Sequence, residues 1–190
     1  MATSILFVQG AGAGTHDDWD RKLVASLERA LGADYRIRYP RMPDEAEPRY
    51  AAWKAALVDE LASLEDGAIV VGHSVGGTVL LHALAEQPPT CRLGAIVSIA
   101  APFIGDGGWP SDDIAPRRDL GAALPAGVPV LLYHGADDTS VPVGHVQLYA
   151  RAIPQAVVRV LADRDHQLGN DLGEVARDLI QTSASTIRAT

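Results

Sequence analysis

Ser74 lies at the centre of a Gly-His-Ser-Val-Gly motif at residues 72–76, and its surroundings are those of a nucleophile. Apolar residues 69–71 before the motif predict a buried strand, and the apolar run 79–84 after it predicts a helix. A serine on a sharp turn between strand and helix stands clear of the sheet, where a histidine can take its proton. The two glycines of the motif lack Cβ atoms and let strand and helix approach closely. The segment therefore predicts nucleophilic chemistry, although a simple strand-to-helix turn has the same pattern.

A serine hydroxyl becomes reactive when a base takes its proton and a carboxylate orients that base. Two later segments supply these residue types: His-Gly-Ala-Asp-Asp-Thr-Ser-Val-Pro at residues 134–142, and Asp-Arg-Asp-His-Gln at residues 163–167. Each directly follows an apolar run of strand length. Because the carboxyl ends of parallel strands meet at one edge of a sheet, we expect an aspartate of the first segment and His166 of the second to reach Ser74.

The order of serine, aspartate and histidine resembles that of the α/β-hydrolase family. Residues 134–142 are similar to the family's His-Gly-x-x-Asp-x-x-Val-Pro pattern, in which the aspartate is the acid of a catalytic triad. The position of Val-Pro assigns that role to Asp138, with its neighbour Asp137 as the alternative. His166 corresponds to the family's histidine after the last strand. The resemblance extends over most of the chain and implies a triad of Ser74, Asp138 and His166.

Two other residues are alternatives for the acid and the base. Some members of the family have the acid after the strand that follows the serine, and Asp106 has that position in this chain. His145 could act as the base, but it falls on a predicted helix directly after the acid. We therefore expect Asp138 and His166 to take these roles.

A glycine-rich segment, Gln-Gly-Ala-Gly-Ala-Gly at residues 9–14, follows the first predicted strand. The resemblance implies that the backbone N–H groups of Ala11 and Val75 form the oxyanion hole. The family usually has His-Gly where this chain has Gln9-Gly10. Backbone donors do not need that histidine, so the substitution alters only what braces the loop.

The same glycines also suggest a dinucleotide-binding loop. That fingerprint requires a third glycine at position 15, which is Thr15 here. The second predicted strand ends in Tyr39-Pro40, without the carboxylate that would bind a ribose. No grouping of histidine, cysteine and carboxylate residues has metal-ligand spacing. We expect neither a cofactor nor a metal.

Short apolar runs alternate with helix-period segments, a pattern typical of a parallel sheet covered by helices on both faces. The resemblance implies an α/β-hydrolase fold with a minimal six-stranded parallel sheet in the order 2-1-3-4-5-6, without two N-terminal strands that are common in the family. We predict strands at residues 5–8, 35–39, 69–71, 93–99, 128–133 and 157–161, and helices at about 18–31, 49–64, 75–87, 143–152 and from 171 onward.

Two of the predicted helices have clear apolar faces. In the first, we expect a buried face of Trp19, Leu23, Leu27 and Leu31, and in the last, a buried stripe of Leu172, Val175, Ala176, Leu179 and Ile180.

Residues 103–126 interrupt this alternation, because they lack a strong period and are rich in glycine and proline. Irregular segments of this length are usually functional or disordered, and this one follows the carboxyl end of a strand, where open α/β sheets bind ligands. We expect a small flap, the alternative being a surface excursion with one short helix around residues 117–124. Our candidates for contacts with a substrate are Gly10, His16, Met42, Phe103 and Trp109.

The bulk composition limits the remaining choices. With 190 residues, 47% of them hydrophobic, the chain suits a single domain over residues 1–190 with a sizeable core. A formal net charge of -8 argues against nucleic acid or an anionic membrane as the main partner. The N-terminus lacks a signal-peptide pattern, and no apolar run approaches the ~20 residues that cross a bilayer. We expect a cytoplasmic protein that is a monomer or a homodimer.

Together these features predict a serine hydrolase that cleaves an ester, thioester or related acyl bond of a small molecule through an acyl-enzyme intermediate. Two other functions stay open at this point. An acyltransferase would use the same residues with an acceptor other than water, and a non-catalytic binding module would keep only the fold.

Overall fold

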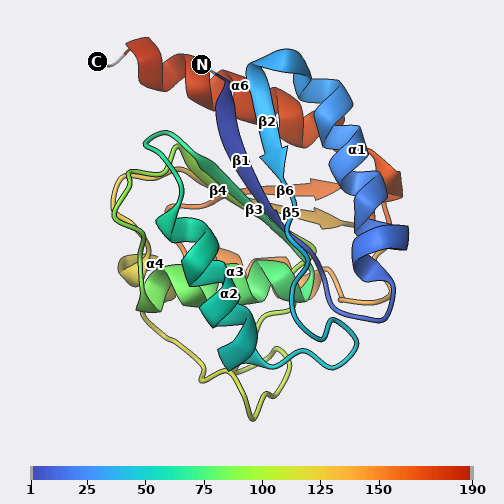
Figure 1. Cartoon of the computed structure of the whole chain (residues 1–190). Coiled ribbons are helices and arrows are strands. Elements are labelled where there is room, and N and C mark those ends of the chain that lie inside the picture. Colours follow the sequence, from blue (N-terminus) through green and yellow to red (C-terminus); the bar gives the residue numbers. More distant parts are fainter. Residues whose placement is uncertain (1, 189–190) are drawn as a thin grey trace.

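The computed structural model describes residues 2–188 and is built on a six-stranded sheet in which each neighbouring strand pair is parallel (Figure 1). The strand order is β2-β1-β3-β4-β5-β6, which confirms the order expected from the sequence. The strands are β1 (Thr3–Val8), β2 (Tyr35–Arg38), β3 (Ile69–His73), β4 (Ala95–Ile99), β5 (Val130–Gly135) and β6 (Val157–Leu161).

Helices cover both faces of the sheet (Figure 1). On one face lie α1 (Asp20–Leu31) and α6 (Gly173–Arg188), and on the other lie α2 (Tyr50–Ala62), α3 (Val75–Glu86), α4 (Leu120–Ala123) and α5 (Gly144–Ala152). Three short helical turns, η1 (Thr15–Trp19), η2 (Gly32–Asp34) and η3 (Leu168–Asn170), complete the described helices.

The inner strands β3, β4 and β5 and the second half of β1 are buried on both faces and largely apolar, whereas the edge strands β2 and β6 are partly exposed and carry arginines. In β1, Leu6 and Val8 belong to the core under α2 and α3, whereas Ile5 and Phe7 belong to the core under α1 and α6. Successive side chains of a strand point to opposite faces of the sheet. A strand with helices over both of its faces is therefore apolar at nearly every position.

The boundaries of several elements differ from the predicted ones by one or two residues. β4 begins at Ala95 because the N–H of Gly94 donates to the carbonyl of Ala68, outside the ladder. β5 continues to Gly135 because its pairing with β6 extends to Leu161. Strand and helix ends depend on these individual hydrogen bonds, which an apolar pattern does not specify.

Two side chains that we expected to be buried are exposed. Trp19 is 54% exposed, because the chain forms the π-helical turn η1 before α1 begins at Asp20, and this turn changes the helical register. Ile180 is 43% exposed, whereas Leu172, Val175 and Leu179 are buried. One step along a helix turns about 100°, which rotates Ile180 to the margin of the buried face.

The segment from residue 103 to residue 126 is irregular apart from α4 and a bridge between Ile104 and Trp109. It follows the carboxyl end of β4 and loops out beside α2 and α3 (Figure 1). The carboxylate of Asp113 accepts a hydrogen bond of 2.8 Å from the N–H of Tyr50, the first residue of α2. No helix in residues 2–188 has the length and apolar character needed to cross a membrane.

Candidate active site

Ser74 lies in the sharp turn that joins β3 to α3. Its backbone has φ 52° and ψ -129°, a conformation that L-residues adopt only when the surrounding structure imposes it. The N–H of Ser74 donates to the carbonyl of Ile99 over 2.8 Å, which fixes the turn against β4. A Cβ atom at Gly76 would lie 2.0 Å from the carbonyl oxygen of Gln9, so only glycine lets α3 start this close to β1.

The structure brings the predicted acid and base to Ser74. The Nε2 atom of His166 lies 3.0 Å from the Oγ atom of Ser74, and its Nδ1 atom lies 2.8 Å from Oδ2 of Asp138. Asp138 stands in the loop after β5, and His166 in the loop after β6. Three loops at one edge of the sheet therefore supply a continuous chain of hydrogen bonds from carboxylate to hydroxyl.

Asp138 is fully buried at its side chain and is held on both oxygens. Its Oδ1 accepts hydrogen bonds of 2.8 Å from the N–H groups of Ser140 and Val141. Its Oδ2 lies 3.2 Å from Nε2 of His134, in addition to the contact with His166. Burial opposes ionisation, but the hydrogen bonds from His134, His166 and Val141 outweigh it and hold the pKa of Asp138 well below its usual value.

The alternative acids and the alternative base lie elsewhere. Asp137 is exposed, and its N–H donates to the carbonyl of Arg164. Asp106 is exposed in the irregular segment after β4. The Nδ1 atom of His145 accepts a hydrogen bond of 2.9 Å from the N–H of Phe103, and its ring contacts that of Trp109 edge-on. None of these three side chains has a hydrogen bond to Ser74 or His166 among the contacts of the described residues.

The loop after β1 packs directly against Ser74. A Cβ atom at Gly10 would lie 3.1 Å from the Cβ atom of Ser74, a contact tighter than most side chains make, so glycine eases this close approach. The N–H groups of Ala11 and Val75 have no acceptor among residues 2–188, and Val75 is the first residue of α3. Free N–H groups at a helix start and a neighbouring loop are the donors that an oxyanion requires.

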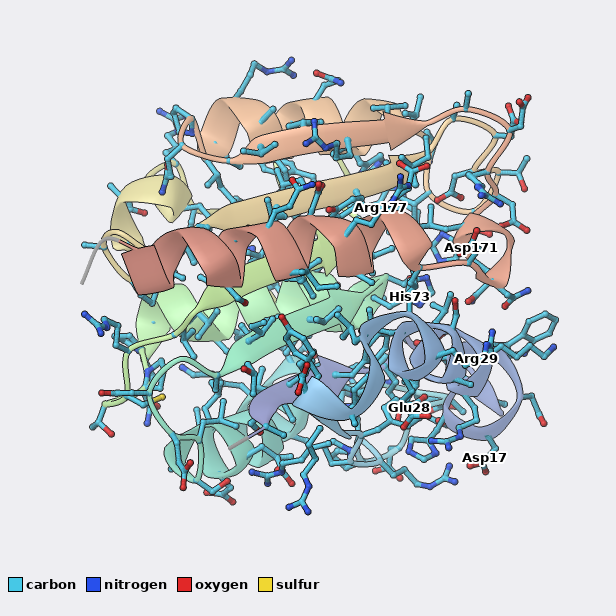
Figure 2. The ribbon with its side chains drawn as sticks, turned by 90° about the horizontal axis from the view of Figure 1, so that it is seen from above. Asp17, Glu28, Arg29, His73, Asp171 and Arg177 are labelled. Carbon is cyan, nitrogen blue, oxygen red and sulfur yellow. The ribbon has the colours of Figure 1, made fainter. Side chains whose placement is uncertain are left out.

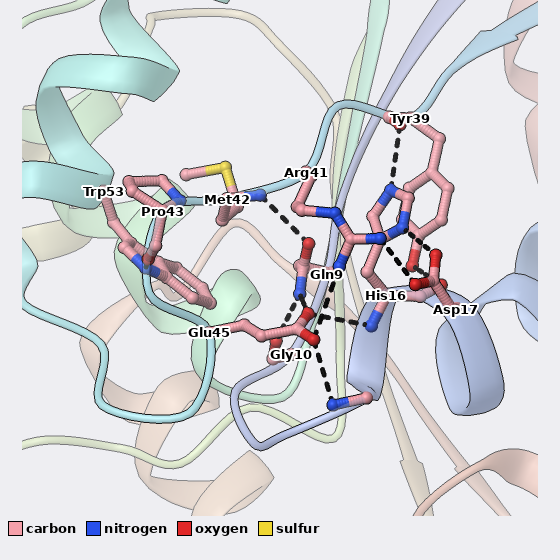
Figure 3. A network of polar contacts seen from close by, with 11 residues as sticks. Gln9, Gly10, His16, Asp17, Tyr39, Arg41, Met42, Pro43, Glu45 and Trp53 are labelled. Atoms are coloured by element: carbon pink, nitrogen blue, oxygen red, sulfur yellow. Dashed lines mark hydrogen bonds and ion pairs between the residues drawn. The ribbon is translucent and has the colours of Figure 1, made fainter.

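The Gln9 side chain, buried completely, braces this loop (Figure 3). Its Oε1 accepts a hydrogen bond of 3.0 Å from the N–H of Met42, and its Nε2 donates to the carboxylate of Glu45. That carboxylate also accepts the N–H groups of Gly14 and His16, at 2.9 and 3.0 Å. The residues after β2 thus hold the loop after β1 in shape.

Glu45 carries a charge in this network. Burial raises the free energy of its carboxylate, but hydrogen bonds from Gln9, His16 and Gly14 overcome this effect and lower its pKa. The backbone of Glu45 adds a further contact, because its carbonyl accepts the N–H of Gly12 over 2.6 Å. This role could not be predicted from the sequence, since Glu45 lies in a polar loop without a motif.

A second buried pair of acid and base lies beside Ser74. His73, the residue before the serine, has its Nδ1 atom 2.9 Å from Oδ1 and 3.0 Å from Oδ2 of Asp20. Asp20 is the first residue of α1, and both side chains are buried. Figure 2 shows His73 at the end of β3, between α1 and the start of α6.

A cavity of about 170 Å³ adjoins α3, and one of the predicted substrate contacts, Trp109, lines it. It is mainly apolar and lies between α2, α3 and the segment after β4. A separate, more open cavity of about 380 Å³ contains Phe103. The residues around the first cavity are Pro48, Arg49, Tyr50, Trp53, Val75, Thr78, Val79, Pro102, Ile104, Trp109, Pro110, Ser111, Asp113 and Ile114.

The other predicted substrate contacts are placed differently. Gly10 adjoins Ser74, as described above. His16 stacks on Tyr39 with ring centroids 4.2 Å apart, and its Nδ1 atom contacts Asp17 (Figure 3). Met42 is buried in the core beneath α2. Neither His16 nor Met42 is among the residues around the two cavities.

Comparison with solved structures gives the same fold with low sequence identity. The product of the ydeN gene from B. subtilis has a TM-score of 0.77 and 18% identity, with 96% of this chain and 100% of that chain covered. The esterase domain of a Rhodothermus marinus protein has a TM-score of 0.63 and 22% identity, with 93% and 84% covered. XC6422 from Xanthomonas campestris, described as an α/β serine hydrolase without lid, has a TM-score of 0.62 and 18% identity, with 96% and 81% covered.

Comparison at the level of sequence identifies the family. No curated protein matches the chain. The model of the alpha/beta hydrolase family matches residues 5–184. This range includes all six strands except the first two residues of β1, and it includes the loops that carry Ser74, Asp138 and His166. Because this match covers nearly the whole chain, the protein belongs to the alpha/beta hydrolase family.

Proposed function

We propose that this hydrolase-family protein is a serine hydrolase that cleaves an ester, thioester or related acyl bond. The observation that carries the proposal is the pair of contacts of His166, 3.0 Å to the Ser74 hydroxyl and 2.8 Å to the Asp138 carboxylate. The nucleophile, the base and the group that orients the base are hydrogen-bonded in the order that acyl transfer through serine requires. The esterase domain and the lidless serine hydrolase among the similar structures support the same class of activity.

The proposed reaction begins when Nε2 of His166 takes the proton of Ser74 as its oxygen attacks the carbonyl carbon of the substrate. The carboxylate of Asp138 holds the Nδ1–H tautomer of His166 and stabilises the imidazolium that forms. The amides of Ala11 and Val75 donate to the developing oxyanion. His166 then gives its proton to the leaving group, and an acyl ester remains on Ser74.

Water completes the reaction in the reverse order. His166 takes a proton from a water molecule, whose oxygen attacks the acyl carbon, and the second tetrahedral intermediate collapses with return of the proton to Ser74. The product is a carboxylic acid. We assign the acyl group to the apolar cavity of about 170 Å³ beside Val75, because this residue carries one of the proposed oxyanion donors. A cavity of this size fits a short acyl chain.

The experiment that tests the proposal is labelling of the pure protein with a fluorophosphonate, followed by mass spectrometry of the modified peptide. We expect modification at Ser74 that is absent in Ser74→Ala and strongly slowed in His166→Ala, with hydrolysis of short-chain esters lost in parallel. Folded protein that is not labelled, or a Ser74→Ala variant that retains turnover, contradicts the proposal.

A further inference from the structure

The contacts of His73 determine its protonation state. Nδ1 faces both carboxylate oxygens of Asp20, at 2.9 and 3.0 Å, and Nε2 faces the backbone carbonyl of His166 at 3.1 Å. A carbonyl oxygen only accepts hydrogen bonds, so Nε2 must carry a proton. A bare Nδ1 would point its lone pair at a carboxylate. Both ring nitrogens of His73 are satisfied together only in the imidazolium form.

The contacts of Asp20 argue against the remaining alternative, in which the proton sits on the carboxyl group. Oδ2 of Asp20 accepts a hydrogen bond of 2.7 Å from the N–H of Gly10, and Oδ1 accepts one of 3.4 Å from the side-chain amide of Gln167. Both oxygens act as acceptors for donors other than His73, which favours the carboxylate. Burial opposes both charges, but their mutual attraction raises the pKa of His73 and lowers that of Asp20.

This ion pair joins the three loops on which the proposed chemistry depends. Asp20 holds Gly10, the residue before the proposed oxyanion donor Ala11. His73 is itself part of the serine turn, and it holds the carbonyl of His166. The rings of His73 and His166 lie with centroids 4.9 Å apart. The loop after β1, which carries the proposed oxyanion donor Ala11, is called the oxyanion loop. A shift of the pair would therefore move the oxyanion loop and the proposed base His166 relative to Ser74.

We propose that Asp20 and His73 form a buried imidazolium–carboxylate pair whose role is to position the oxyanion loop and His166 around Ser74. Neither residue reaches the site of reaction, so both are positioning residues. The inference rests on the proposed function of Ser74 and His166. The titratable groups that face His73 are Asp20 from α1 and, in the loops after β6 and β5, His166 and Asp138.

Two substitutions separate the two hydrogen bonds of His73. The amide nitrogen of Asn lies near the position of Nδ1, so His73→Asn keeps the contact with Asp20 and loses the one with His166. The amide nitrogen of Gln lies near the position of Nε2, so His73→Gln keeps the contact with His166 and loses the one with Asp20. Both side chains are neutral, so each variant leaves the charge of Asp20 without a counterion. His82→Gln is the matched control, because His82 is also buried in the core and has no contact with these loops.

For His73→Asn we expect the rate of fluorophosphonate reaction and kcat to fall by about 10- to 100-fold with KM nearly unchanged, since a small misplacement of the base has this effect. For both His73→Asn and His73→Gln we expect the acid limb of the pH–rate profile to move to higher pH, because the uncompensated carboxylate of Asp20 favours the protonated form of His166. The His82→Gln control should show neither effect. The melting temperature of each variant is measured as well. Equal melting temperatures would show that the loss of activity comes from misplaced groups and not from unfolding.

A direct test reads the His73 ring by ¹⁵N NMR, with its signals assigned by their loss in His73→Gln. At pH 7, above the ordinary histidine pKa of about 6.5, we expect both nitrogens of His73 to show the imidazolium pattern, and Asp20→Asn to abolish it. A neutral ring in the wild type at pH 7 overturns the ion pair. Wild-type kinetics in both folded His73 variants overturn the positioning role, whereas a wild-type protein that ignores the fluorophosphonate overturns the proposed function itself.

Discussion

The carboxylate of Asp138 uses its two oxygens for different purposes. Oδ1 is occupied by the N–H groups of Ser140 and Val141, which fixes the plane of the carboxylate. Oδ2 remains for His166, with His134 at 3.2 Å as a second neighbour. The loop that supplies the acid thus also sets the direction from which the acid meets the proposed base.

This arrangement predicts different outcomes for two adjacent aspartates. Asp138→Asn should lower kcat for ester hydrolysis by about 10⁴-fold, because the amide can donate to Nδ1 and then stabilises the wrong tautomer of His166. Asp137→Asn should leave kcat within about twofold, because surface substitutions away from special contacts have small effects. Steady-state kinetics on both variants checks this, and the reverse ranking would move the acid to Asp137.

Among the elements, the loop between β1 and α1 depends most on distant residues. Glu45, which follows β2, accepts hydrogen bonds from Gly14, His16 and Gln9 and thereby determines the path of the loop beside Ser74. Gln9 occupies the place where the family usually has histidine, and its two ends bind Met42 and Glu45. In this chain, the side-chain amide of Gln9 and the carboxylate of Glu45 brace the loop.

The loop's dependence on Glu45 can be measured. Glu45→Gln replaces one accepting oxygen with a donor that faces other donors, so we expect the loop to shift and kcat to fall by about 10- to 100-fold. Glu47→Gln is the control, since Glu47 is exposed in the same loop. The comparison uses ester hydrolysis at saturating substrate, and equal rates for the two variants would show that Glu45 does not shape the oxyanion loop.

The segment after β4 gives a prediction about chain length. Trp109 lines the apolar cavity beside Val75, so Trp109→Ala should enlarge it. Each further methylene that the enlarged cavity buries should raise kcat/KM by about fourfold, because burial of one methylene is worth about 0.8 kcal/mol. A series of aryl esters of increasing acyl length would show the optimum move to longer chains.

Trp19→Ala is the matched control for this series, because Trp19 is exposed on η1 and lines neither cavity. An unchanged optimum in Trp109→Ala, or an equal change in Trp19→Ala, would place the acyl group elsewhere.

At the scale of the whole molecule, the Asp20–His73 pair connects folding to pH. The pKa of His73 is raised in the folded state, so its contribution to stability is complete below about pH 6.5 and is lost as the pH rises through the raised value. The folded protein binds the proton more tightly than the unfolded chain over that range. The free energy of unfolding should therefore fall with pH by up to about 1.4 kcal/mol per unit in the wild type.

Urea unfolding of wild type and His73→Gln between pH 6 and pH 9 checks this prediction. The difference between the two curves isolates His73 from the other titrating groups. The expected result is a difference that shrinks as the pH rises, and a constant difference would exclude a charged His73 in the folded protein.

Much of the architecture could be predicted from the sequence, because its signals are local. The positions of strands and helices follow from apolar runs, and the strand order and the grouping of Ser74, Asp138 and His166 follow from motifs at strand ends that resemble those of the α/β-hydrolase family. The bracing contacts could not be predicted in this way. His73 contacts the carboxylate of Asp20, 53 residues away, and Glu45 accepts the backbone N–H of Gly14, 31 residues away. Neither pairing produces a periodic pattern in the sequence.

The exposure of Trp19 shows the limit of periodicity in another way. A π-helical turn ahead of α1 changes the helical register, and the inward position passes to Asp20, a charged residue. An apolar pattern favours a buried tryptophan here, whereas the structure buries the carboxylate that holds His73. The helix was predicted correctly, whereas the exposure of Trp19 and the burial of Asp20 were not.

All strands run in the same direction, so the start of β1 and the end of α6 lie at the edge of the sheet opposite Ser74 (Figure 1). Tyr35, which opens β2, contacts Ser183 of α6 at that edge. Attachment of the protein to a resin or electrode near Thr3 or Ser183 would leave the edge that carries Ser74, Asp138 and His166 facing the solution. Attachment through residues 103–126 would instead bring the surface close to that edge, because this segment follows the carboxyl end of β4.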